Sequence, residues 1–224
     1  MTTKKPVVKD TSPVDWKVQA VLTPALAAAS LFLIMAVQRI HLLAPAEWFV
    51  HQVVLKENAD LALLGFTAVW TYYITNWVAN LSMGFFASNG KIAMSNMRAQ
   101  KAFLSGLPAR LNAVHFNALE TFPLFAAAVV SARIMGVPPH LRAGFAMIYV
   151  VARLVHAVSF ALDLVLLRTL SYYVSVNTSL ILLAFAANPQ WYEKYEYYSG
   201  YTDAKLSSAS KSAAKVASKL KKEL

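Results

Sequence analysis

Five apolar segments, each about as long as a membrane is thick, constrain what this chain can fold into more than any other feature. The hydrocarbon core of a bilayer is about 30 Å thick, so a helix needs about 20 mostly apolar residues to cross it. Only 14% of the residues are charged, whereas a soluble domain has roughly 25%. We therefore expect an all-α membrane protein. The segments are residues 18–37, 61–87, 111–135, 143–162 and 169–187.

The breaks between these segments predict three regions. Residues 1–57 contain a basic N-terminal segment, one transmembrane helix at 18–37 and a polar connector. Residues 58–190 are expected to form a four-helix membrane core, in which Gly-Val-Pro-Pro at 136–139 separates two helices. Residues 191–224 form a basic C-terminal tail, of which residues 206–224 are rich in Ser, Ala and Lys. The first helix is therefore an addition in front of a four-helix transmembrane bundle.

The formal net charge of +10 comes from clusters of Lys and Arg beside the apolar segments. Such clusters are attracted to anionic headgroups and favour the cytosolic side, so they do not indicate nucleic-acid binding. Five crossings would place the N-terminal lysines and the basic residues of 88–110 in the cytosol. The tail, with its dilysine Lys221-Lys222, would then lie in the lumen, where a retrieval signal is not read. We expect an endoplasmic reticulum membrane, with a mitochondrial or other organelle membrane as the alternative.

Cysteine is absent from the sequence. This excludes a disulfide framework, a thiolate metal site and a cysteine nucleophile. The five histidines do not have the spacing of a metal-binding motif. We therefore expect no metal site.

Glu120 is the residue of the segment 111–135 that costs the most free energy to place inside a membrane. Translocon scales assign about 2.5 to 3.5 kcal/mol to an acidic residue at the centre of a membrane helix, and such a residue normally faces a bundle interior beside a partner. Asn117 precedes it by three residues and therefore shares its helix face. Arg153 interrupts the next apolar segment and is the candidate partner. This predicts an intramembrane polar site, which either fixes helix register or also contacts a ligand.

Arg110, Asn117 and Glu120-Thr-Phe-Pro123-Leu-Phe125 together resemble the second-helix signature of the MAPEG family, the membrane-associated proteins of eicosanoid and glutathione metabolism. Tyr149-Val-Val-Ala-Arg153-Leu-Val-His156 and Arg168-Thr-Leu resemble the third and fourth helices of that family. The likeness covers about residues 58–187. It implies a four-helix bundle that assembles as a homotrimer, with glutathione bound between adjacent subunits.

The resemblance also implies roles for individual residues. Family members use a glutathione thiolate, and because a free thiol has a pKa of about 8.5, a nearby arginine favours the anion. Arg168 is the candidate for this catalytic role. The candidate glutathione-binding residues are Arg110, His115, Asn117, Glu120, Arg153 and His156.

The sequence departs from the family pattern at three positions. Ala113 stands four residues before Asn117, where the family usually has an arginine, and His156 and Phe160 replace tyrosines that hold glutathione. Two functions are therefore considered. The first is a glutathione-dependent transferase or peroxidase for hydrophobic electrophiles or lipid hydroperoxides. The second is a non-catalytic subunit of a larger membrane assembly. The added helix and the basic tail are the features that such a role would use.

Overall fold

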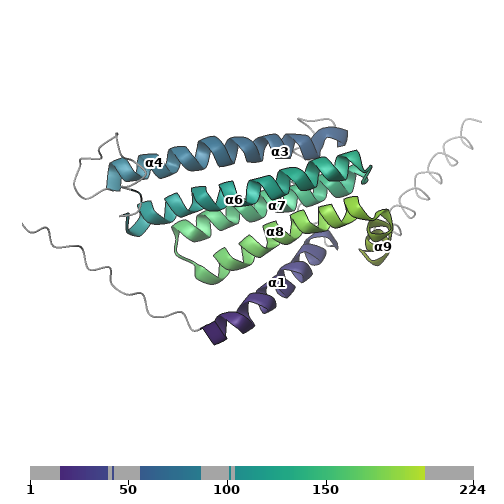
Figure 1. The fold of residues 1–224 in the computed structure, drawn as a ribbon, viewed down its shortest axis with the longest axis horizontal. Helices are drawn as coiled ribbons and strands as arrows, with labels where there is room; N and C mark the ends of the chain where they lie inside the picture. The colour runs from purple at the N-terminus through teal and green to yellow at the C-terminus, as the bar shows by residue number, and fades with distance from the viewer. Residues whose placement is uncertain (1–15, 40–41, 43–55, 87–100, 102–103, 200–224) are drawn as a thin grey trace, which may run out of the picture.

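The structure is a computed structural model that describes residues 16–39, 42, 56–86, 101 and 104–199. All regular elements in these ranges are helical (Figure 1). The basic N-terminal segment, the connector, most of the loop 88–105 and the tail with Lys221-Lys222 lie outside the described residues. The helices are α1 (Trp16–Arg39), η1 (Lys56–Asn58), α3 (Ala59–Val69), η2 (Trp70–Ile74), α4 (Thr75–Phe86), α6 (Gly106–Ile134), α7 (Pro139–Ala161), α8 (Val165–Ala187) and α9 (Pro189–Ser199).

Long antiparallel helices form the body of the protein (Figure 1). α3, η2 and α4 follow one another without a break and make one rod, in which η2 is a π-helical turn. The rod lies along α6, and α1 lies against α8 on the other side of the bundle (Figure 1). α7 is the central helix, because every residue from Leu141 to Val150 is buried.

The helices have the length and composition that a bilayer requires. Residues 21–39 of α1, together with α6, α7 and α8, are each long and apolar enough to cross a membrane. The rod of α3, η2 and α4 carries only Asp60, at its first turn, as a charged residue. The expected all-α fold with membrane-length helices is confirmed.

Two tight links set the order of α6, α7 and α8. Gly136 ends α6 with a φ of 74°, and the amide of Val137 donates to the carbonyl of Ala132 at 2.9 Å. This is the Schellman arrangement, in which a left-handed residue follows the helix. Pro139 then begins α7, where a missing amide proton costs nothing. Asp163 takes the same left-handed role between α7 and α8, with a φ of 61°.

The buried core lies where α6, α7 and α8 meet. Phe125 of α6 and Tyr149 of α7 stack at 3.8 Å between ring centres, and both side chains are almost completely buried. Phe145 packs edge-on against Phe185 of α8 at 5.6 Å. These contacts hold the three helices in register and place the polar residues of α7 between α6 and α8.

Candidate functional site

Glu120 lies on the exposed face of α6 in the single chain. No ion pair joins it to any other residue in the described part of the chain. Within the single chain, Glu120 therefore does not face the bundle interior, although its expected partner Arg153 lies within electrostatic reach. The residues exposed with it recur at alternating spacings of four and three, so they form one stripe along the helix. This α6 stripe consists of Phe116, Glu120, Pro123, Ala127, Val130 and Ile134.

Asn117 is half-buried and bonds within its own helix. Its Nδ2 donates to the carbonyl of Ala113 at 3.0 Å, and its own carbonyl accepts from the Thr121 hydroxyl at 2.9 Å. The Tyr149 hydroxyl donates to Thr121 Oγ1 at 3.2 Å. A chain of hydrogen bonds therefore leads from α7 to the backbone of Asn117 and fixes this part of α6 against α7.

Arg153 is buried between α6 and α8. It lies within electrostatic reach of Glu120 and of the tyrosines Tyr149 and Tyr172. Among the described residues, its Nη1 has no hydrogen-bond partner. A buried guanidinium nitrogen without a partner is unusual, because a lost hydrogen bond to a charged group is costly. Arg153 therefore presents a free donor inside the membrane-spanning region.

His156 lies one turn further along α7 and has one free nitrogen. Its Nδ1 lies 3.0 Å from the backbone carbonyl oxygen of Arg168. Because a carbonyl can only accept, Nδ1 carries the proton, and in the neutral ring Nε2 is then an acceptor. Nε2 is buried and has no partner within the part of the chain that the structure describes. His156 thus ties α7 to α8 through one nitrogen and leaves the other available.

Arg168 lies in the first turn of α8, over an aromatic ring. The carbon of its guanidinium lies 4.4 Å from the ring centre of Phe160, a favourable cation–π distance. Asp163 is 4.0 Å away, and its carboxylate is mostly exposed, so this ion pair is weak. Phe160 therefore supports Arg168, although it lacks the hydroxyl that a family tyrosine would present.

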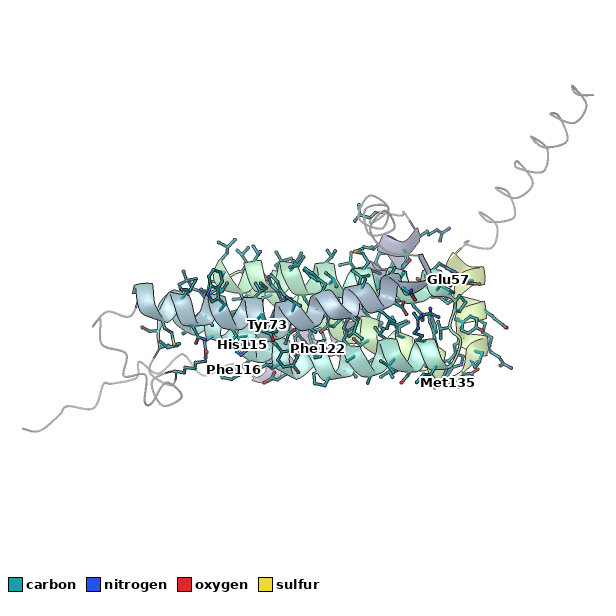
Figure 2. All side chains as sticks on the ribbon, turned by 90° about the horizontal axis from the view of Figure 1, so that it is seen from above. Glu57, Tyr73, His115, Phe116, Phe122 and Met135 are labelled. Carbon is teal, nitrogen blue, oxygen red and sulfur yellow. The ribbon has the colours of Figure 1, made fainter. Side chains whose placement is uncertain are left out.

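Arg110 and His115 take places apart from this group. Arg110 Nε donates to the carbonyl of Ala161 at 3.2 Å and so caps the end of α7. His115 Nδ1 lies 3.0 Å from the hydroxyl of Thr75 in α4. Its ring centre lies 5.8 Å from that of Phe116, the next residue of α6 (Figure 2). No contact described for His115 reaches α7 or α8, so the structure does not bring it together with His156.

Tyr172 is a member of this site that sequence reasoning missed. It follows Arg168 by four residues, and its ring centre lies 6.1 Å from that of His156. The spacing of four residues on one helix was the available signal.

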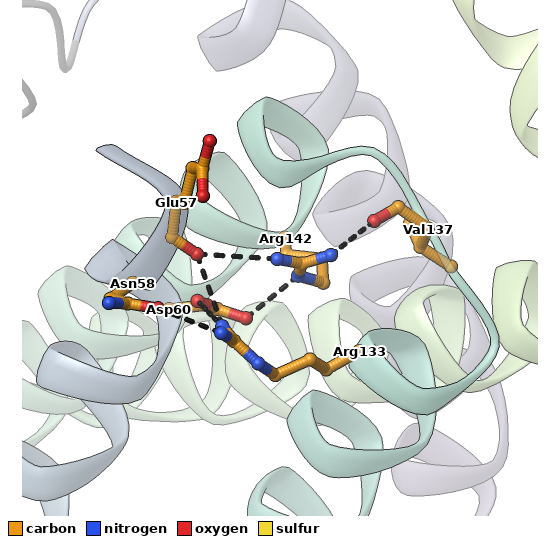
Figure 3. A network of polar contacts seen from close by, with 6 residues as sticks. All are labelled: Glu57, Asn58, Asp60, Arg133, Val137 and Arg142. Atoms are coloured by element: carbon orange, nitrogen blue, oxygen red, sulfur yellow. Dashed lines mark hydrogen bonds and ion pairs between the residues drawn. The ribbon is translucent and has the colours of Figure 1, made fainter. Parts of the chain in front are cut away.

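A second polar group, also missed, lies at the opposite end of the bundle (Figure 3). The buried carboxylate of Asp60 accepts from Arg142 Nε at 2.7 Å and from Arg133 Nη1 at 3.0 Å. The backbone carbonyl of Glu57 accepts from both arginines. Asp60 thereby joins the start of α3 to the end of α6 and the start of α7. Its position at the edge of an apolar segment made it look like an ordinary boundary residue.

Comparison with known proteins decides the family. The family model described as the MAPEG family matches residues 61–188. The chain belongs to the MAPEG family. It is accordingly an integral membrane protein, in agreement with its membrane-length helices. Comparisons with curated proteins and with solved structures return no match. All candidate residues of this MAPEG chain lie within the matched region, whereas α1 and α9 lie outside it.

Proposed function

We propose that this MAPEG protein is a glutathione-dependent transferase or peroxidase acting on hydrophobic electrophiles or lipid hydroperoxides. The observation that carries the proposal is a pair of free polar atoms on α7, Arg153 Nη1 and His156 Nε2. One is a donor and the other an acceptor, and both are buried. The second ring nitrogen of His156 contacts the backbone carbonyl of Arg168. Buried polar atoms normally have partners, so this pair is suited to a polar ligand. Glutathione offers carboxylates to the arginine and amide hydrogens to the imidazole.

Arg168 has the properties that thiolate stabilisation requires. A positive charge within about 4 to 6 Å of an acid lowers its pKa by about 1 to 3 units. Arg168 is about a quarter exposed, so its charge can reach a ligand, and the Phe160 ring holds it in place. The remaining candidates, Arg110, His115, Asn117 and Glu120, would hold the peptide in an assembled oligomer. His115 is the least favoured of them because it contacts α4.

The chemistry follows from the thiolate, which is the nucleophilic form of the sulfur. In transfer, the sulfur forms a bond to an electrophilic carbon, and the leaving group departs with the bonding electrons. In peroxide reduction, the sulfur attacks the terminal oxygen, the O–O bond breaks, and the alkoxide takes a proton. A second glutathione then displaces hydroxide from the oxidised sulfur, which yields water and glutathione disulfide.

The α6 stripe supports the proposal that the chain forms a homotrimer. A carboxylate exposed to lipid costs free energy, so we expect another part of the assembled protein to shield Glu120 from the lipid. A neighbouring copy of the chain that packs on the stripe would remove Glu120 from lipid. The stripe also contains Pro123 and Ala127, whose small side chains allow close approach of a second helix. Such packing would also place Glu120 at a subunit boundary, where the family binds glutathione.

A second candidate function is that of a non-catalytic subunit in a larger membrane assembly. The observation that favours it is α1, which lies outside the family match and is bonded to the core by Asn177. An added helix of this kind gives a partner protein a surface that the family core lacks. Under this reading, Arg153, His156 and Arg168 would serve only to hold α7 against α8.

Glutathione binding by the purified protein separates the two functions. We expect millimolar glutathione to raise the unfolding temperature of the wild-type protein and of Arg39→Ala, which removes an exposed arginine at the end of α1. Arg168→Ala should lose turnover of a chloroarene and of a hydroperoxide. The absence of any thermal shift would contradict the enzyme. Wild-type turnover that Arg168→Ala abolishes would contradict the non-catalytic subunit.

A further inference from the structure

A pocket of about 150 Å³ lies between α1, α7 and α8, and none of the candidate site residues lines it. Its floor is formed by buried apolar side chains from all three helices, including Ile34, Ile148 and Val174. Ser171 is the one residue with a polar side chain in the lining, and its hydroxyl donates to the carbonyls of Leu167 and Arg168. The hydroxyl hydrogen is thus engaged within α8, and the lining exposes no polar surface to the pocket.

The rim of the pocket is apolar as well, and it is open. Leu33, Leu42, Val155 and Leu167 line the pocket and are each more than a third exposed. Three of these residues belong to helices long and apolar enough to cross a membrane. In a bilayer, the pocket consequently opens sideways into hydrocarbon.

Two contacts hold α1 against α7 and α8. Asn177 Nδ2 donates to the Ser30 hydroxyl at 2.6 Å and to the carbonyl of Ala27 at 3.3 Å. Two turns later, Gln38 occupies the space that a side chain at Gly144 would fill. The α1 residues that line the pocket within the helix, Leu33, Ile34 and Val37, all lie between Ser30 and Gln38. The pocket is thus built by the docking of α1 against α7 and α8.

We propose that this pocket binds a segment of an acyl chain from a membrane phospholipid. Water is excluded, because a buried water needs two to four polar partners and the lining has none free. A void is unfavourable, since the lining atoms lose dispersion contacts. A protein cavity of about 150 Å³ lined by apolar residues binds benzene, so a short stretch of hydrocarbon chain fits this volume. A substrate that must be oriented would need polar contacts, which the pocket lacks.

This inference goes beyond the proposed function and does not depend on it. α1 lies outside the family match, so the pocket belongs to this chain and not to the shared core. A bound chain would fill the space between the added helix and the α7–α8 hairpin, and it would make the attachment of α1 dependent on lipid.

The test is photocrosslinking of the full-length protein in vesicles of phosphatidylcholine that carries a diazirine in the middle of one acyl chain. Adducts are mapped by mass spectrometry. We expect enrichment at Leu33 and Leu167 over Val69 of α3 and Leu81 of α4, which are at least as exposed as Leu33 but do not line the pocket. Equal labelling at all four residues would overturn the proposal.

Two variants of α7 provide a matched comparison. Val155→Trp places a large ring at the rim and should fill the pocket, whereas Val158→Trp places the same ring at an exposed position outside it. We expect Val155→Trp to reduce labelling of Leu33 and Leu167 to the level of Val69, and Val158→Trp to leave it unchanged. Enrichment that persists in Val155→Trp would refute acyl-chain binding at this site. So would an equal loss in both variants.

Discussion

The central guanidinium carbon of Arg168 lies over the ring of Phe160, 4.4 Å from the ring centre. Phe160 is a departure from the family pattern, where a tyrosine is expected. Its ring nevertheless provides the face that a cation prefers, because the π-electrons of an aromatic ring attract positive charge. The substitution therefore removes a hydroxyl and keeps a support for the arginine that we propose stabilises the thiolate.

Replacing Phe160 should weaken the proposed catalysis through Arg168. A cation–π contact contributes about 0.5 to 2 kcal/mol, so Phe160→Leu should lower kcat/KM by roughly two- to thirtyfold. Its pH profile should shift to higher pH, because a less well placed Arg168 stabilises the thiolate less. Phe160→Tyr keeps the ring and should retain both activity and profile. Steady-state turnover at several pH values measures this, and an unchanged profile in Phe160→Leu would contradict the role of the ring.

Variants of His156 test the roles of its two ring nitrogens separately. His156→Asn can still donate to the Arg168 carbonyl from the position of Nδ1, but it has no group at the position of Nε2. We expect it to keep most of the stability and to lose glutathione affinity. His156→Ala should lose both, with about 1 kcal/mol of stability from the missing hydrogen bond. Thermal unfolding and calorimetric titration with glutathione measure these effects. Wild-type affinity in His156→Asn would show that Nε2 does not contact the ligand.

Removal of the Asp60 carboxylate should have the largest effect on stability. Asp60→Asn leaves Arg142 buried and Arg133 half-buried beside a neutral group. Breaking a buried ion pair by removing one partner costs about 3 to 5 kcal/mol. Glu57→Gln is the control, because the described contacts of Glu57 to the arginines come from its backbone carbonyl. It should stay within about 0.5 kcal/mol of wild type. Denaturant unfolding in detergent tests both, and equal stability of the two variants would contradict the role of Asp60.

The buried hydroxyl of Tyr195 in α9 should make the folded protein less stable in alkali. Its ring lies 5.5 Å from that of Phe145 and 5.4 Å from that of Phe185, and its hydroxyl has no partner among the described residues. Burial raises the pKa of Tyr195 from about 10 to about 12. The folded state therefore keeps a proton that the unfolded state loses, so the free energy of unfolding should fall between about pH 10 and pH 12. Below that range this contribution is fully present.

The matching variant is Tyr195→Phe, which keeps the aromatic packing and removes the hydroxyl. Its unfolding temperature should depend less on pH above about pH 10 than that of the wild-type protein. At neutral pH it should be at least as stable, since the buried hydroxyl without a partner is gone. Parallel pH dependence in the two proteins would show that Tyr195 is not responsible.

The family resemblance named the candidate residues, and their spacing predicts which of them share a helix face. Arg153 and His156 are three residues apart on one helix, so they had to share a face, and the structure confirms that both are buried on α7. Spacing cannot say which neighbouring helix a residue meets. His115 shares α6 with Asn117, yet it contacts Thr75 of α4. Glu120 seemed to need an internal partner but lies on the exposed α6 stripe.

The sequence by itself determined the family, the membrane and the helices. These follow from local quantities, namely the length of the apolar segments, the placement of proline and glycine, and a short motif with its spacing. Only the tertiary structure decided the pairing of Asp60 with two arginines, the support of Arg168 by Phe160, and the pocket beneath α1. Each of these brings together side chains from different helices. Helix rotation and tilt are set by packing over the whole interface, and no short stretch of sequence encodes them.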